Sequence, residues 1–90
     1  MPTWAEVERA ARAVDGKKGF AEFLERYMAW GRYSETEIGC FLDTDAGRVN
    51  RWRNGEGPGD KVANSCRTVL TRRRDEFEAL RKLIKEYNQL

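Results

Sequence analysis

The chain has 90 residues, of which 36% are charged and 40% hydrophobic, and its mean hydropathy is −0.81. This length and composition predict one small, well-solvated domain that covers residues 1–90. No stretch approaches the roughly 18 consecutive apolar residues of a membrane span, and no signal peptide precedes the first predicted helix. We therefore expect a cytoplasmic protein without a membrane partner.

The sequence lacks the residue types on which most catalytic and metal sites depend. It contains no histidine, which is the commonest general base and metal ligand. Cys40 and Cys66 are too few and too far apart for a zinc site or a disulfide scaffold, and we expect both to be buried, reduced thiols. The sequence has no glycine-rich phosphate loop and no nucleophile with an evident base. We expect neither an enzyme nor a bound cofactor or metal.

Two amphipathic helices are predicted in the first third of the chain. Thr3 and Glu6 have capping-box spacing at the start of a helix over residues 4–14. A break at residues 15–19 leads to a second helix over residues 19–30. A domain of this size needs its large apolar residues for burial, so we interpret both apolar faces as core rather than as a ligand pocket. These faces consist of Trp4, Val7, Ala11, Val14, Phe20, Phe23, Leu24, Tyr27 and Met28.

The segment from residue 34 to residue 58 predicts two short helices joined by a tight turn. Ser34 and Glu37 form a capping box at the start of a helix over residues 35–42. Its apolar face consists of Ile38, Phe41 and Leu42. Either Asp43 or Asp45 can cap the next helix, over residues 45–53. The pair therefore forms a helix-turn-helix.

The second helix of this pair has one apolar and one polar face. Val49 and Trp52 face the core, with Trp52 expected to lie buried near Ile38, Leu42 and Val49, and Gly55 ends the helix. At about 100° per residue, the residues that point away are Gly47, Asn50, Arg51 and Asn54, with Arg48 and Arg53 on the flanks. Such a face suits the major groove of DNA, where Asn reads adenine and Arg reads guanine. The alternative interpretation is an exposed helix face that is simply polar.

Residues 49–56, Val-Asn-Arg-Trp-Arg-Asn-Gly-Glu, with Pro58 just beyond, resemble the end of the recognition helix in the Cro/repressor (xenobiotic-response-element-like) helix-turn-helix family. Gly39 matches the small residue that this family places where its two helices pack closely, and Leu42 matches the apolar residue before the turn. The chain departs from the family at Asp43, where glycine is usual, and at Thr44, where an apolar residue is usual.

The resemblance implies an all-α DNA-binding fold, and with the helix geometry it assigns the site residues. By resemblance Ala46, Gly47 and Arg51 contact bases, and Ser34 and Asn54 contact phosphate. The complete prediction places base contacts at Ala46, Gly47, Asn50 and Arg51, and backbone contacts at Arg32, Ser34, Arg48, Arg53 and Asn54. We expect a transcriptional regulator or repressor that binds double-stranded DNA.

The last predicted element is a helix over residues 60–88, with Asp60 as its cap. A seam with spacings of three and four runs along it: Ala63, Cys66, Leu70, Arg73, Phe77, Leu80, Ile84 and Tyr87. We expect its first part, residues 62–70, to complete the core. Residues 73–90 either fold back on the first two helices or form a dimerisation tail, with an interface of Phe77, Leu80, Ile84 and Tyr87.

The charge distribution leaves a second function open. The net charge is +2, and residues 60–90 contain eight Lys or Arg and five Asp or Glu. Glu35, Asp43 and Asp45 place negative charge close to the predicted DNA surface. These acids would suit a basic partner protein, so the alternative is a protein-binding adaptor or inhibitor built on a helix-turn-helix scaffold.

Overall fold

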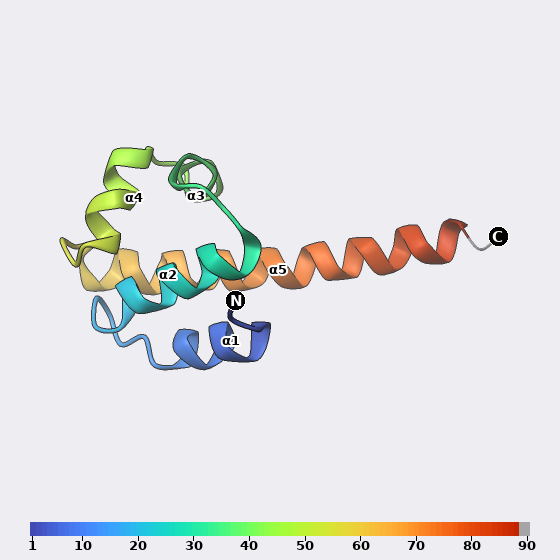
Figure 1. The fold of residues 1–90 in the computed structure, drawn as a ribbon, viewed down its shortest axis with the longest axis horizontal. Coiled ribbons are helices and arrows are strands. Elements are labelled where there is room, and N and C mark those ends of the chain that lie inside the picture. The colour runs from blue at the N-terminus through green and yellow to red at the C-terminus, as the bar shows by residue number, and fades with distance from the viewer. Residues whose placement is uncertain (89–90) are drawn as a thin grey trace.

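A computed structural model describes residues 1–88, which form five α-helices and no strand (Figure 1). The helices are α1 (Trp4–Arg12), α2 (Phe20–Gly31), α3 (Glu35–Phe41), α4 (Ala46–Arg53) and α5 (Asp60–Asn88). The predicted fold class, a small five-helix all-α domain with a long C-terminal helix, is confirmed. No helix within this described range is long and apolar enough to cross a membrane.

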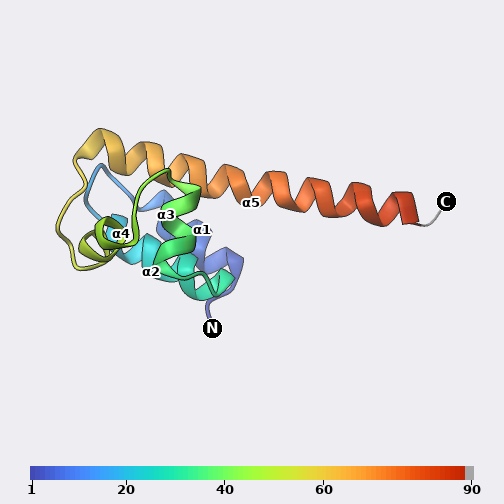
Figure 2. The same ribbon diagram turned by 90° about the horizontal axis from the view of Figure 1, so that it is seen from above.

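The first four helices gather along the first half of α5, and the second half of α5 extends beyond them (Figures 1 and 2). The core is therefore shared by all five helices, but α5 contributes to it only through its first three turns. The buried apolar residues are Val7, Ala11, Val14, Phe20, Phe23, Leu24, Tyr27, Met28, Ile38, Val49, Trp52, Ala63, Cys66 and Leu70. Most lie at the three- and four-residue spacing that the sequence predicts for core faces.

Side-chain caps begin three of the helices where the sequence predicts them. The Ser34 hydroxyl accepts a hydrogen bond from the Glu37 backbone N–H at 3.1 Å, and the Glu37 carboxylate accepts one from the Ser34 N–H at 3.0 Å. Thr3 caps α1 by accepting from the Glu6 N–H at 3.4 Å. Of the two candidate caps of α4, the structure uses Asp45, whose carboxylate accepts from the Arg48 N–H at 2.7 Å. These bonds satisfy N–H groups that have no partner inside the helix.

The segment between α1 and α2 is a tight turn held by the start of α5. The Gly16 N–H donates to the Asn64 side-chain oxygen at 3.2 Å, and the Lys17 N–H donates to the Asp60 carboxylate at 2.9 Å. The prediction that Asp60 caps α5 is wrong, because Asp60 is the first residue of the helix and its carboxylate binds this turn instead. A side chain predicted to act locally thus joins two segments that are distant in sequence.

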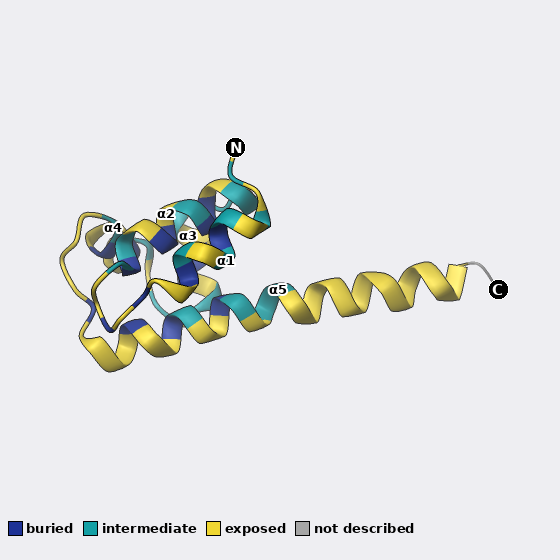
Figure 3. Ribbon diagram, turned by 90° about the horizontal axis from the view of Figure 1, so that it is seen from below, coloured by how far each residue is buried: buried dark blue, intermediate teal, exposed yellow. Residues whose placement is uncertain are grey.

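The long helix leaves the domain at residues 73 and 74. The Arg73 guanidinium carbon lies 3.6 Å from the centroid of the Phe41 ring, and that of Arg74 lies 4.7 Å from the Trp4 ring centroid. Every described residue after Arg74 is exposed (Figure 3). The alternative in which residues 77–87 fold back on α1 and α2 is therefore not adopted. These two cationic side chains therefore end the packed part of the helix.

The two cysteines differ in exposure. Cys66 is buried among the core residues, and this burial raises the pKa of its thiol. Cys40 is exposed, so the prediction that both thiols are buried is wrong for this residue. Cys40 lies two residues after the buried Ile38 on α3, and at about 100° per residue it points to the opposite side of the helix.

Trp52 is buried, as predicted, but its environment extends beyond the helix-turn-helix. Its ring packs edge-to-face against Phe20 of α2, with 6.0 Å between the ring centroids. Ile38 and Val49 are fully buried, whereas Leu42 is only half-buried at the edge of the core. Trp52 therefore packs the helix-turn-helix against α2 and also contributes to the core between α3 and α4.

Candidate nucleic-acid interface

The turn between α3 and α4 has the close packing of a helix-turn-helix. A Cβ atom at Gly39 would lie 2.8 Å from the Thr44 carbonyl oxygen, so a larger residue does not fit without a backbone shift. Asp43 has φ +56°, the left-handed conformation that glycine adopts most easily and that aspartate tolerates. Asp43 thus adopts a glycine-like conformation. Thr44 buries a hydroxyl that has no hydrogen-bond partner within residues 1–88.

A Schellman motif ends α4 at the predicted position. Gly55 has φ +86° and donates its N–H to the Trp52 carbonyl at 3.1 Å, and the Glu56 N–H donates to the Arg51 carbonyl at 2.9 Å. This pair of bonds satisfies the last carbonyls of the helix and turns the chain away sharply. The candidate recognition helix is therefore short and held at both ends.

The outward face of α4 is the one that the sequence predicts. Val49 and Trp52 are buried, and the exposed residues of the helix and its C-cap are Gly47, Arg48, Asn50, Arg51 and Asn54. Ala46 and Arg53, at either end of this face, are half-buried. The face thus offers small, amide and guanidinium groups, the side-chain types that read base edges or bind phosphates.

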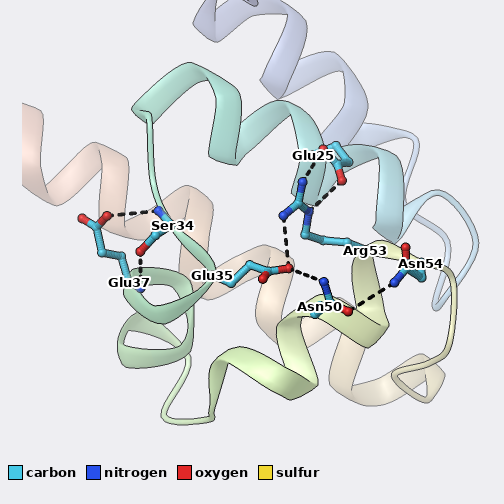
Figure 4. Close-up of polar contacts among 7 residues, drawn as sticks. All are labelled: Glu25, Ser34, Glu35, Glu37, Asn50, Arg53 and Asn54. Atoms are coloured by element: carbon cyan, nitrogen blue, oxygen red, sulfur yellow. Dashed lines mark hydrogen bonds and ion pairs between the residues drawn. The ribbon is translucent and has the colours of Figure 1, made fainter.

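Arg53 is held by two carboxylates from other helices (Figure 4). Its Nε donates to Glu25 of α2 at 2.7 Å, with a second bond from Nη2 to the same carboxylate at 3.2 Å, and its Nη1 donates to Glu35 at 3.1 Å. The hydrogen bond to Glu25, and then that to Glu35, raise the pKa of the Arg53 guanidinium above its ordinary value. Such a bidentate pair orients the guanidinium toward α2 and α3.

Asn50 belongs to the same network. Its Nδ2 donates to Glu35 at 2.9 Å, while its Oδ1 accepts from Nδ2 of Asn54 at 3.3 Å. Glu35 therefore joins Arg53 to Asn50, and Asn50 continues to Asn54, across the side of the recognition face (Figure 4). Three of the predicted DNA-contacting residues have their side chains oriented by one another and by two acids. Ser34 is likewise engaged as the cap of α3.

Three predicted contact residues carry guanidinium groups without a protein partner. Arg32, Arg48 and Arg51 are exposed, and their side chains make no ion pair or hydrogen bond with the residues that the structure describes. Arg32 adopts a left-handed conformation, φ +56°, at the end of α2, where the following N–H of Tyr33 bonds to the Met28 carbonyl.

Glu25 is the part of this site that sequence reasoning missed. It lies 28 residues before Arg53, on a helix interpreted only as core packing. No local pattern connects the two residues, because their contact exists only when α2 and α4 pack together. The sequence analysis identified Glu35 only as a negative charge near the predicted DNA surface and did not predict its bonds to Asn50 and Arg53.

The residues predicted as a dimer interface are exposed on the projecting half of α5. The exposed fractions are 51% for Phe77, 54% for Leu80, 52% for Ile84 and 75% for Tyr87. Leu83 beside them is 62% exposed. Within residues 1–88, no three acidic, cysteine or histidine side chains are placed to hold an ion.

Comparison of the chain with models of known families, with curated proteins and with solved structures gives no significant match.

Proposed function

We propose that this protein binds double-stranded DNA sequence-specifically, with α4 in the major groove, and regulates transcription as a homodimer. The observation that carries the proposal is the α3–α4 unit, in which Gly39 permits close packing and α4 presents Gly47, Asn50 and Arg51 outward. A helix presented in this way can enter a groove about 12 Å wide. The resemblance to the Cro/repressor family supports the same function.

The contact residues divide into base readers and backbone binders. Arg51 and Asn50 are central on the exposed face, so they read base edges, and Ala46 and Gly47 allow close approach to the bases. We assign the phosphate contacts to Arg32, Ser34, Arg48, Arg53 and Asn54. Phosphate contacts fix position and carry most of the salt dependence, whereas base contacts carry sequence information.

The test compares the base reader Arg51 with the backbone binder Arg48, because both are exposed and neither has a protein partner that its loss would leave unpaired. A selection from random duplex DNA first identifies the bound sequence. Arg51→Ala should then lose about 1–3 kcal/mol of discrimination at one base pair. Arg48→Ala should weaken binding to all sequences equally and reduce the slope of log affinity against log salt by about 1. Equal, sequence-independent losses from both variants would contradict base reading by Arg51.

A second function, binding to a partner protein, is favoured by the acids at the recognition face. Glu25 and Glu35 share the single cation of Arg53, and Glu35 otherwise binds only the neutral amide of Asn50, so this side of the face keeps a net negative charge. Such a surface would suit a partner with basic side chains. Retention on random duplex DNA at low salt, lost as salt is added, supports DNA binding. Absence of retention at low salt would favour the adaptor.

A further inference from the structure

The groove between α1 and α5 is lined by three arginines and is separate from the recognition face. It encloses about 540 Å³, and its guanidinium groups belong to Arg12, Arg67 and Arg74. Trp4 and Ala11 add apolar surface beside them. Figure 1 shows α1 and the α3–α4 pair on opposite sides of α2, so a molecule in this groove would not occupy the surface of α4.

Helical spacing brings two of these arginines to one side of α5. Arg67 and Arg74 are seven residues apart, about two turns, so they leave the helix in nearly the same direction, roughly 10 Å apart along its axis. The long stems of two arginines can bring their ends together over this distance. Thr71, between them, donates its hydroxyl proton to the Arg67 carbonyl at 2.9 Å. The donors that this face offers to a ligand are therefore the two guanidinium groups.

The acids in the groove leave these two cations incompletely paired. Glu8 binds Arg12, with 2.6 Å between its Oε1 and the arginine Nη2. Arg67 forms no ion pair with any residue that the structure describes. The Nη1 of Arg74 lies 3.5 Å from Oδ1 of Asp75, longer than a good hydrogen bond, and the Asp75 side chain is 71% exposed. Three arginines against two acids thus leave a positive charge in excess.

Both guanidinium groups are partly enclosed by the protein. The Nε atoms of Arg67 and Arg74 are shielded from solvent and have no hydrogen-bond partner within residues 1–88. The Arg74 side chain is 27% exposed, and its guanidinium carbon lies 4.7 Å from the centroid of the Trp4 ring. Taking a cation partly out of water without a hydrogen-bonding anion costs free energy, which an anion bound at the terminal nitrogens would recover. Because packing already restrains the two stems, such an anion would have to order little of the protein.

The number of donors favours a phosphate over a carboxylate. A carboxylate has two oxygens, which a single guanidinium group can occupy in a bidentate pair. A phosphate monoester has three terminal oxygens and a charge of about −1.5 to −2 at pH 7, so two arginines can share it. We propose that the groove between α1 and α5 binds a small phosphate monoester, whose phosphate lies between Arg67 and Arg74 and whose organic group packs against Trp4 and Ala11. This site does not depend on DNA binding.

Titration of the full-length protein with phenyl phosphate tests the site. Two-dimensional ¹H–¹⁵N spectra in a Tris buffer without phosphate report arginine Nε–H and tryptophan indole N–H groups. The signals of Arg67, Arg74 and Trp4 should shift together and reach saturation. Absence of a saturable shift at the two arginines would overturn the proposal.

Two further anions test which part of the ligand is recognised. Inorganic phosphate should bind about tenfold more weakly than phenyl phosphate, because it has no apolar group to bury. Benzoate should also bind about tenfold more weakly, because its carboxylate satisfies only one of the two arginines. Inorganic phosphate that binds as tightly as phenyl phosphate would overturn the contact with the organic group. Benzoate that binds as tightly would overturn the preference for phosphate.

A matched pair of variants tests the arginine contact. Arg67→Gln should weaken phenyl phosphate binding about tenfold or more, because it removes a charge-assisted hydrogen bond. Arg72→Gln, exposed on another side of α5, removes the same charge and should change the affinity by less than about twofold. Equal losses from the two variants would show general attraction to a basic surface and would overturn the site.

A second pair tests the site through a gain in affinity, without altering either arginine. Asp75→Asn removes the acid that competes for Arg74, so phenyl phosphate should bind several-fold more tightly. Glu76→Gln removes the same charge on another side of α5 and should change the affinity by less than about twofold. Both positions are exposed, so circular dichroism should show unchanged helix content. An Asp75 variant that binds no more tightly than the Glu76 variant would overturn the contact at Arg74. None of these measurements involves DNA, so their outcome is distinct from that of the proposed function.

Discussion

At the scale of single residues, Tyr27 combines complete burial with an unsatisfied hydroxyl. Its side chain is 0% exposed, and its hydroxyl has no hydrogen-bond partner within the part of the chain that the structure describes. Burial, followed by the neighbouring Tyr33, raises the pKa of Tyr27 to about 12 from its ordinary value of 10.0. The ring itself packs among Trp4, Phe23 and Tyr33, so its contribution is mainly apolar.

Tyr27→Phe should therefore be neutral or stabilising by about 1 kcal/mol at pH 7, because it removes a buried polar group that lacks a partner. The folded protein binds the phenolic proton more tightly than the unfolded chain. The titration of this group therefore leaves the free energy of unfolding unchanged below pH 10 and lowers it as pH rises toward 12. The difference between variant and wild type should grow by about 1 kcal/mol between pH 7 and pH 11. Urea unfolding at the two pH values measures it, and a destabilised Phe variant at pH 7 would indicate that the hydroxyl is satisfied.

A second single residue, Glu35, sets the charge of the recognition face. Its carboxylate accepts from both Asn50 and Arg53, at 2.9 and 3.1 Å. On DNA, the same carboxylate would lie near phosphates and repel them.

Glu35→Gln should tighten DNA binding several-fold at low salt, because it removes about 1 kcal/mol of repulsion while retaining a similar shape. Glu86→Gln, on the projecting end of α5, changes the net charge equally and serves as the control. Fluorescence anisotropy with the selected duplex measures both. Equal gains from the two variants would show a general charge effect, and a loss from Glu35→Gln would show that its positioning of Asn50 outweighs repulsion.

At the scale of elements, the turn between α1 and α2 is held by α5 and depends on glycine. Gly16 has φ +61°, and a Cβ atom there would collide with the Asp60 carboxylate. Gly55 has φ +86° but open space around it, and Gly59 has open space without a positive φ. A substitution at Gly16 therefore meets both backbone strain and a steric clash, one at Gly55 meets strain alone, and one at Gly59 meets neither.

Gly16→Ala should destabilise the protein by about 2–3 kcal/mol, since it adds a collision to the strain of a left-handed alanine. Gly55→Ala should cost about 1–2 kcal/mol from strain alone, and Gly59→Ala should remain within about 0.5 kcal/mol of the wild type. Chemical denaturation of the three variants gives the comparison. A Gly16 variant no weaker than the Gly55 variant would show that Asp60 moves aside without cost.

At the scale of the whole molecule, the domain and its projecting helix are energetically separate. Packing ends at Arg73 and Arg74, and the apolar residues beyond them contribute nothing to the core of one copy. Their removal should affect assembly without affecting the fold.

Leu80→Glu together with Ile84→Glu should give a folded monomer. Its denaturation midpoint should equal that of the wild type at protein concentrations where the wild type is also monomeric. Tight DNA binding should be lost, because a single helix-turn-helix contacts only one half-site. Sedimentation measures the oligomeric state, circular dichroism measures the fold, and fluorescence anisotropy measures DNA binding. The matched control Glu78→Gln/Lys82→Gln changes the outer side of the same helix, and a comparable loss from it would contradict a specific seam.

The sequence alone determined the helices and the face that α4 presents. Ser34, Asp45 and Gly55 set the ends of α3 and α4 through bonds to backbone groups within four residues, and such bonds form wherever the chain is helical. The burial of Val49 and Trp52 followed from helical periodicity in the same local way. The boundaries therefore agree to within two residues at every helix.

Only the tertiary structure decided what the polar side chains bind. Glu25 reaches Arg53 across 28 residues, and Asp60 serves a turn 43 residues earlier instead of its own helix. The projection of α5 away from α1 and α2 likewise depends on how helices pack against one another. A pattern of three and four residues identifies which face of a helix is apolar, but the neighbour that this face meets is a property of the assembled core, in which residues far apart along the chain compete for the same contacts.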